Sequence, residues 1–334
     1  MIKGELKGDG VVLGEDGLSL YEQGGYGRPG GDKLALSAEE ALYLAARGRI
    51  CVGCYSFEQL LGQFMEKSYF LRKFLVYRDI RERGFVIQAG PQDFRVFKRG
   101  QKPGTGSSYY LMRVLSERDL IEFSKVAEEV KSAHNMRKQF LLAVVDDEEE
   151  ITYYEVKISS PMEGTAKPIC SHITGNAYEN AVIIPANPED SEFEETMLGT
   201  KFDQERIMLS SVEALYLLKK GILELNGGMT YDEYYRRAEE NDHELSQKTI
   251  TYTNLRDLKN IPRTAYKFGH HFRVYSGKKQ HSELLVHSLP ENESMPMSVI
   301  SRSVRLAHSV RKKMLFACVK KDNIEYIEFA RIKL

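Results

Sequence analysis

Residues 36–44 read LSAEEALYL and residues 209–217 read LSSVEALYL, so seven of nine positions are identical. Residues 124–145 align with residues 298–319 at a constant offset of 174, and nine of these 22 pairs are identical. Between these blocks, DFRVF at 93–97 corresponds to HFRVY at 271–275. Because the blocks recur in the same order, we predict a tandem duplication. The period is much longer than that of a solenoid, so each copy is predicted to be a whole unit of two small lobes.

The segment between the copies, residues 159–168, has few large apolar side chains and contains two prolines, which is typical of a linker. The duplication and this linker predict five segments along the chain. These are an N-terminal lobe at 1–70, a C-terminal lobe at 71–160, a linker at 161–175, a second N-terminal lobe at 176–250 and a second C-terminal lobe at 251–334.

Periodicity predicts an α/β (α+β) fold in each copy. Short alternating segments open each copy, and an amphipathic helix follows at 38–47 and at 211–220, with Gly48 and Gly221 as helix stops. The second copy then predicts helices at 231–241, near 253–259 and at 298–313, and strands at 272–275, 284–289, 314–319 and 325–332. Helices between strands that cannot all form hairpins indicate a mixed sheet flanked by helices.

Composition narrows the class of protein. The 334 residues carry 47 Lys and Arg against 48 Asp and Glu, a net charge of −1, which excludes a polybasic tail but not a local basic patch. We expect a soluble, cytoplasmic protein without a membrane span or signal peptide. Cys51 and Cys54 have zinc-like spacing, but no second Cys/His pair with suitable spacing accompanies them, so no metal site and no cofactor are predicted.

The two copies differ where a strand meets a loop. The second copy has Tyr275, a loop at 276–280 and then His281, whereas the first has Phe97 and Ser107 at these positions. Lys312 follows on the predicted helix at 298–313, on nearly the same face as Arg305 and about 10.5 Å away along the axis. Tyr, His and Lys can together serve as a metal-free set for proton transfer and charge stabilisation.

The first copy retains the cation, as Lys138, but lacks both the hydroxyl and the imidazole. The sequence therefore predicts that the first copy is a scaffold and that chemistry belongs to the second. Retention of the lysine could equally reflect packing that the two copies share, and a basic helix face is more often simply solvated.

These stretches resemble the archaeal tRNA-splicing endonuclease, in its homodimeric branch with two fused units per chain. The similarity lies in FRVY at 272–275, HS at 281–282 and VRLAHSVRKK at 304–313, together with YRDIRERGF at 77–85 in the first copy. The resemblance implies excision of introns from precursor tRNA at bulge-helix-bulge sites without a metal, leaving 2′,3′-cyclic phosphate and 5′-hydroxyl ends. It also implies a catalytic triad of Tyr275, His281 and Lys312, with Arg305 and Arg331 holding a bulged base.

An acidic run in the first copy has a counterpart in the same family, where a loop at this place docks into a basic cleft of the partner subunit. The run comprises Asp146, Asp147, Glu148, Glu149 and Glu150. The matching turn of the second copy is not acidic, so the charge is not needed for the turn itself. A solvated loop is the alternative. Opposite charge would steer such docking, so the resemblance predicts a homodimer.

Two other functions stay open on the sequence. One is a non-catalytic protein that binds structured RNA and keeps only the fold and the arginines. The other is a metal-dependent nuclease of related fold, which requires clustered carboxylates near the lysine. We expect chelator sensitivity to separate the latter from the metal-independent endonuclease.

Overall fold

The computed structural model describes residues 1–186, 191–277, 281–321 and 323–334. The chain forms two compact units. The first comprises Met1–Lys157 with Ser294–Ser301 and Ala330–Leu334, and the second comprises Ile158–Glu293 with Arg302–Phe329. Both units are mixed α/β. Among the described residues, no helix combines the length and the apolar composition that crossing a membrane requires.

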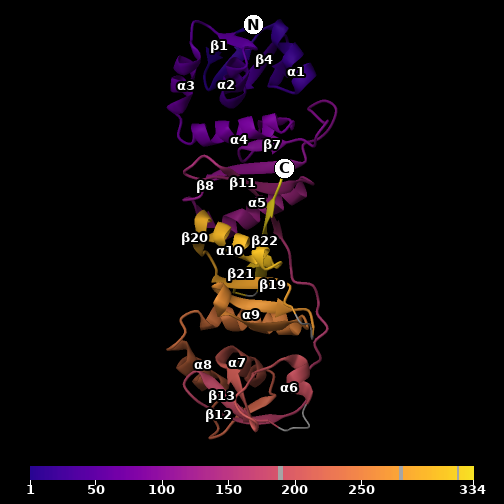
Figure 1. Cartoon of the computed structure of the whole chain (residues 1–334), viewed down its shortest axis with the longest axis vertical. Coiled ribbons are helices and arrows are strands. Elements are labelled where there is room, and N and C mark those ends of the chain that lie inside the picture. Colours follow the sequence, from indigo (N-terminus) through magenta and orange to yellow (C-terminus); the bar gives the residue numbers. More distant parts are fainter. Residues whose placement is uncertain (187–190, 278–280, 322) are drawn as a thin grey trace. The chain divides into compact units, whose positions relative to one another are not determined.

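The first unit opens with a small sheet packed against helices, and Figure 1 shows α2 beside β1 and β4. The strand order is β3-β4-β2-β1-β5, with β1 and β5 parallel. Its elements are β1 (Ile2–Lys7), β2 (Gly10–Leu13), η1 (Glu15–Gly17), α1 (Leu18–Gly24), β3 (Arg28–Gly30), β4 (Lys33–Ser37), α2 (Ala38–Ala46), β5 (Ile50–Val52) and α3 (Phe57–Met65). Gly48 follows α2 with φ +65°, which confirms the predicted helix stop.

The second lobe of the first unit holds a sheet in the order β6-β7-β8-β10-β11, in which β8 and β10 are parallel. Its elements are α4 (Phe70–Glu82), β6 (Ile87–Ala89), β7 (Phe94–Val96), β8 (Tyr110–Ser116), β9 (Leu120–Glu122), α5 (Phe123–Asn135), β10 (Gln139–Val145) and β11 (Ile151–Ile158). β20 (Ser294–Pro296) also belongs to this unit and pairs antiparallel with β9.

The second unit repeats the first lobe with the strand order β14-β15-β13-β12-β16. Its elements are β12 (Ile173–Ala177), β13 (Ala181–Pro185), α6 (Ser191–Thr196), β14 (Thr200–Lys201), β15 (Arg206–Ser210), α7 (Ser211–Lys219), β16 (Leu223–Leu225) and α8 (Tyr231–Glu239). Gly221 has φ +69° after α7, so this helix also stops at the predicted glycine. The predicted domain boundaries stay a prediction, and residues between Ile158 and Ile173 form neither helix nor strand.

The second lobe of this unit carries a sheet in the order β17-β18-β19-β21-β22, and α9 runs beside β19 and β21 (Figure 1). Its elements are α9 (Leu245–Asp257), β17 (Ile261–Ala265), η2 (Tyr266–Phe268), β18 (His270–Tyr275), β19 (Leu284–Pro290), α10 (Met297–Ser309), β21 (Lys313–Lys320) and β22 (Asn323–Ile332). The start of α10, up to Ser301, and the end of β22, from Ala330, are assigned to the first unit. Pro262 lies within β17, which is an edge strand of the sheet. Proline is tolerated there because an edge strand has no neighbour on its outer side to which a backbone N–H would have to donate.

The repeated LSxxEALYL stretch begins a helix in both units through the same serine and glutamate. Glu40 accepts from the backbone N–H of Ser37 at 3.0 Å, and it also accepts from Gly27 N–H at 2.8 Å. Glu213 accepts equivalently from Ser210 N–H at 2.9 Å and from Gly199 N–H at 3.0 Å. The N3 carboxylate thus fixes the helix start and ties a distant loop to it, a variant of the capping box. Burial raises the pKa of Glu40 above its ordinary value.

Candidate active site

The strand register brings the three predicted catalytic positions to one end of the second unit's sheet. Tyr275 ends β18, and the N–H of Glu283 donates to the carbonyl of Val274 at 2.9 Å. The N–H of Lys313 in turn donates to the carbonyl of Glu283 at 3.1 Å. Tyr275, the segment 281–283 and Lys312 therefore follow one another across β18, β19 and β21.

Lys312 is anchored beside His281. Its Nζ donates a hydrogen bond to the carbonyl of Ser282 at 2.7 Å, and Ser282 directly follows the exposed His281. Burial, followed by the positive charge of Arg273, lowers the pKa of Lys312 below its ordinary value. Residues 278–280 of the predicted loop lie outside the described residues.

Lys312 is not on the helix, so the sequence prediction that it shares a helical face with Arg305 is wrong. α10 ends at Ser309 because Arg311 adopts a left-handed conformation with φ +56°. The N–H of Lys312 bonds back to the carbonyl of Ala307 at 2.8 Å, the closing contact of a Schellman-type helix end. The side chain therefore leaves from the short connection before β21.

The first unit repeats this anchor without the other two groups. Lys138 Nζ donates to the carbonyl of Ser108 at 2.7 Å, which matches the bond from Lys312 to Ser282. Phe97 is buried after β7, and Ser107 is exposed next to Ser108. The lysine therefore has a structural role that both copies share, and only the second copy adds a hydroxyl and an imidazole to it.

Tyr275 is almost completely buried, with 6% of its surface exposed. The guanidinium of Arg273 lies 6.0 Å from the centre of its ring, on the same side of β18, as strand alternation predicts. The buried Nε of Arg273 has no hydrogen-bond partner among the described residues. Two cations, Arg273 and Lys312, thus lie near this end of the sheet and provide positive charge for an anionic ligand.

The two predicted RNA-binding arginines are both exposed. Arg305 lies on α10 in the second unit, and Arg331 lies on β22 in the part of that strand assigned to the first unit. Their exposure leaves both guanidinium groups accessible to a ligand.

The acidic loop is partly occupied by its own structure. The side chain of Asp146 accepts from the N–H groups of Glu148 and Glu150, at 3.0 and 2.9 Å, and Asp147 pairs with Arg118. Glu148, Glu149 and Glu150 are exposed. Four of the five predicted docking residues are therefore exposed to solvent, although Asp147 is ion-paired, while Asp146 holds the turn.

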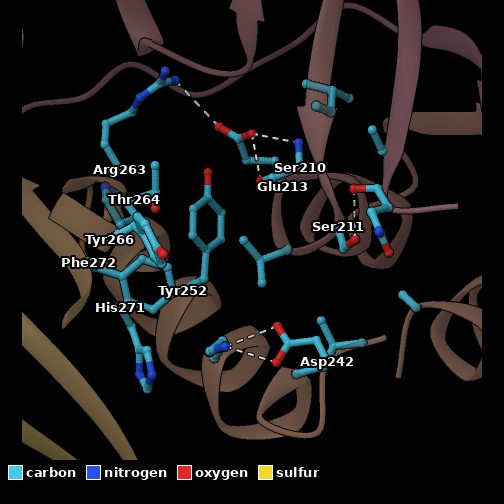
Figure 2. A pocket seen from close by; sticks show the side chains of 18 of the residues that line it. Ser210, Ser211, Glu213, Asp242, Tyr252, Arg263, Thr264, Tyr266, His271 and Phe272 are labelled. Atoms are coloured by element: carbon cyan, nitrogen blue, oxygen red, sulfur yellow. Dashed lines mark hydrogen bonds and ion pairs between the residues drawn. The ribbon is translucent and has the colours of Figure 1, made fainter. Parts of the chain in front are cut away.

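A cavity of about 830 Å³ lies elsewhere in the second unit, between its two lobes. Its charged side chains are paired with each other: Arg263 lies 3.5 Å from Glu213, as Figure 2 shows. Lys248 lies 2.9 Å from Asp242. The described residues that line it do not include Tyr275, His281 or Lys312. Because its charged side chains are paired with each other, we interpret this cavity as a space between the packed lobes and not as a ligand site. Among the described residues, no group of three or more His, Cys, Asp or Glu side chains is arranged to hold a metal ion.

The sequence did not lead us to predict one hydrogen-bonded tyrosine–arginine pair in the second copy. Tyr77 and Arg81 of α4 were noted in the run 77–85, and Arg81 Nε donates to the Tyr77 hydroxyl at 3.0 Å. Tyr252 and Arg256 of α9 repeat this bond at 2.9 Å. The signal was present as tyrosine and arginine four residues apart in YTNLR at 252–256, but the intervening residues differ from those of the first copy.

The fold and this site define a duplicated α/β protein in which one copy carries a complete Tyr–His–Lys set and the other only its lysine. Comparison with known proteins agrees with the duplication. The family model for the tRNA intron endonuclease N-terminal domain matches residues 2–61 and 174–235. The model for the catalytic C-terminal domain of the same family matches residues 70–153 and 245–326.

Full-length relatives give the same assignment. The chain is 37% identical to a tRNA-splicing endonuclease of Methanococcoides burtonii, with all of both chains covered. It is 37% identical to that of Methanosarcina mazei, covering all of this chain and 99% of that protein. It is 32% identical to that of Halobacterium salinarum, over 98% of this chain and 99% of that protein. The chain belongs to the tRNA intron endonuclease family, which confirms the resemblance inferred from its sequence.

Proposed function

We propose that this protein is an RNA endonuclease that excises introns from precursor tRNA at bulge-helix-bulge sites. The observation that carries the proposal is the end of the second unit's sheet, where Lys312 is bonded to Ser282 beside His281 and where Tyr275 ends β18, the strand next to β19. Membership of the tRNA intron endonuclease family supports it independently.

The chemistry follows from these three side chains. In its phenolate form, Tyr275 accepts the proton of the RNA 2′-hydroxyl and becomes a neutral phenol, and the 2′-oxygen attacks the adjacent phosphorus. His281 donates a proton to the departing 5′-oxygen, and Lys312 stabilises the negative charge of the phosphorane. The products are a 2′,3′-cyclic phosphate and a 5′-hydroxyl. We propose that no metal is required, because these groups supply the base, the acid and the countercharge.

We further propose that the working form is a homodimer with two active sites. A substrate with two bulges has approximate twofold symmetry, and an isologous dimer presents two equivalent sites to it. Each chain supplies one complete set, since Phe97 and Ser107 occupy the corresponding places in the first unit. The exposed glutamates at 148–150 are proposed to dock on basic residues of the partner.

The test is incubation with an intron-bearing tRNA precursor in EDTA, followed by analysis of the fragment ends. We expect two cuts that leave cyclic phosphate and 5′-hydroxyl ends. Cleavage that stops in EDTA and returns with Mg²⁺ would instead identify a metal-dependent nuclease. Tight RNA binding without cleavage under either condition would identify a non-catalytic RNA-binding protein.

A further inference from the structure

The linker between the two copies is bound along the second unit, next to Tyr275. Gly164 N–H donates to the carbonyl of Leu258 at 2.8 Å, and Ala166 N–H donates to that of Lys259 at 2.9 Å. Between them, the N–H and the hydroxyl of Thr165 both donate to the carbonyl of Ser276, at 2.7 and 3.1 Å. Residues 162–166, here called the strap, therefore alternate between the α9–β17 connection and the residue that follows Tyr275.

Further contacts hold the strap at its start. The side-chain amide of Asn260 donates to the carbonyl of Met162 at 3.0 Å, and Lys259 forms an ion pair with Glu163 at 2.5 Å. Both Lys259 and Glu163 are exposed, so this ion pair adds little. The backbone bonds define the position of the strap.

Two glycines make the close approach possible. A Cβ on Gly164 would lie 2.2 Å from the carbonyl oxygen of Lys259 and 2.9 Å from that of Ser276. A Cβ on Gly277 would lie 2.3 Å from the hydroxyl oxygen of Thr165. Any side chain at Gly164 therefore has to displace the strap, because the atoms that it meets belong to the backbone.

The strap contacts the residues that flank the two strands at Tyr275, just before β17 and just after β18. In the β17–β18 ladder, Tyr275 pairs with Ile261. On one side, the strap contacts Asn260, which directly precedes Ile261. On the other side, it contacts Ser276, which directly follows Tyr275. The strap thus bridges the open end of the strand pair at the tyrosine.

The first unit closes the same place in a different way. Lys98 follows Phe97 as Ser276 follows Tyr275, and its carbonyl accepts from the N–H of Gln101 within its own loop, at 3.0 Å. The copy with the tyrosine uses the linker for this bond, and the copy with the phenylalanine uses its own loop.

We propose that the strap is a positioning element for Tyr275, which fixes the end of β18 so that the phenol is held in place for catalysis. The proposal rests on the proposed function, because it assigns the strap to the reaction in which Tyr275 is the base. It also gives the linker a second role beyond joining the two copies.

The test is Gly164→Ala in the full-length protein, assayed for cleavage of an intron-bearing tRNA precursor. We expect the maximal cleavage rate to fall about 10- to 100-fold with KM within about twofold, because a displaced general base affects the transition state and not RNA binding. Gly62→Ala is the matched control, since its added methyl meets nothing within 4 Å. Thr165→Val keeps the N–H that donates to Ser276 but lacks the hydroxyl, so it should lower the cleavage rate less than Gly164→Ala does. It provides a second test if Gly164→Ala folds poorly.

A double-mutant cycle shows whether the strap acts through the tyrosine. In a Tyr275→Phe background, Gly164→Ala should cause little further loss, because the group that it misplaces is already absent. If the rate losses of Gly164→Ala and Tyr275→Phe multiply in the double variant, the proposal is wrong. It is also wrong if a variant whose Thr165 N–H has lost its protection from hydrogen exchange still cleaves at the normal rate.

Failure of the proposed function would be seen separately, because the unmodified protein would then not cut the precursor in EDTA. The strap proposal would still be tested by hydrogen exchange. Gly164→Ala should raise exchange at residues 275–277 and leave the corresponding residues 97–99 of the first unit unchanged. Unchanged exchange at 275–277 would refute the positioning role.

Discussion

Mild acid should loosen the second unit through a histidine cluster on β18 and β19. The rings of His271 and His287 stack with their centres 4.3 Å apart, and His270 lies 5.5 Å from His287. His271 Nδ1 accepts from the N–H of Ser288 at 2.9 Å, while its Nε2 lies 3.3 Å from Glu244. Only the neutral ring can accept at Nδ1, so protonation would set two donors against each other.

Burial, followed by the charge of His287, lowers the pKa of His271 to about 4, and burial likewise lowers that of His270 to about 4. Because the unfolded chain binds these protons more readily, the stabilisation is complete above pH 6.5 and is lost as the pH falls toward 4. For His271 alone, the loss relative to neutral pH is about 2 kcal/mol at pH 5 and about 3 kcal/mol at pH 4.

The first unit provides an internal control. Asp93 takes the place of His271 there, and its side chain accepts from Val114 N–H at 2.7 Å, as His271 accepts from Ser288. Asp93 also lies 2.6 Å from Lys73. No histidine takes part in this contact, so it should survive the acid that breaks the one in the second unit.

The assay is urea unfolding at pH 7 and pH 5, followed by circular dichroism because the chain contains no tryptophan. Hydrogen exchange, corrected for intrinsic rates, then locates the loss. We expect β18 and β19 to lose protection before β7 and β8. His271→Asn retains an acceptor for Ser288 but removes the ring that takes up the proton. The variant should be less stable than the unmodified protein at pH 7, because the packing of the ring is lost. Its free energy of unfolding should fall by about 2 kcal/mol less on going from pH 7 to pH 5. An equal loss in both proteins would refute the reasoning.

Three further predictions concern cleavage and assembly. His281→Ala should slow cleavage about 10²- to 10⁴-fold while the Kd for RNA changes little, because a proton donor acts only in the transition state; a rate within a few-fold of normal would remove it from the mechanism. Replacing Arg305 and Arg331 together with Ala should weaken cutting at bulged sites about 5- to 150-fold, the equivalent of about 1–3 kcal/mol of base stacking, and normal cutting would rule out a base clamp. Replacing the glutamates at 148–150 with Gln should lower both dimer affinity and activity at low protein concentration, as measured by light scattering and cleavage; an unaffected, fully active dimer would contradict the docking role. Asp146 is left intact in that variant because it holds the turn.

The sequence predicted the architecture well because each helix and strand occurs twice, so that each could be inferred from two segments of the chain. Helices α2 and α7 begin at the third residue of the repeated motif, as predicted, and each ends two residues before the predicted glycine. Local side-chain chemistry determined these ends, through the glutamate at N3 and the glycine with positive φ. Local features of this kind can be read from a single sequence.

Element ends that depend on long-range contacts were not predictable in the same way. The helix predicted near 253–259 begins at Leu245, and its start contains no apolar stripe, because Thr249 and Thr251 are buried among its polar residues. The helix predicted at 298–313 ends at Ser309 because Arg311 is left-handed without being a glycine. A helix stop formed by an arginine is not visible in a propensity pattern, because side chains with a Cβ are rarely found at positive φ.

The retained lysine shows how a duplication should be used in assigning function. Lys138 persists in a copy without the hydroxyl and the imidazole, and its bond to Ser108 explains why: it ties the chain after α5 to the chain before β8, the strand that pairs with β10. Lys312 makes the same bond, so its retention alone does not indicate chemistry. What distinguishes the second unit is the pair of groups added around a cation that the fold already requires. Phe97 packs where Tyr275 packs, and both are buried, so the phenol hydroxyl is not needed to fill the site. The hydroxyl of Tyr275 and the imidazole of His281 are therefore the features that point to catalysis.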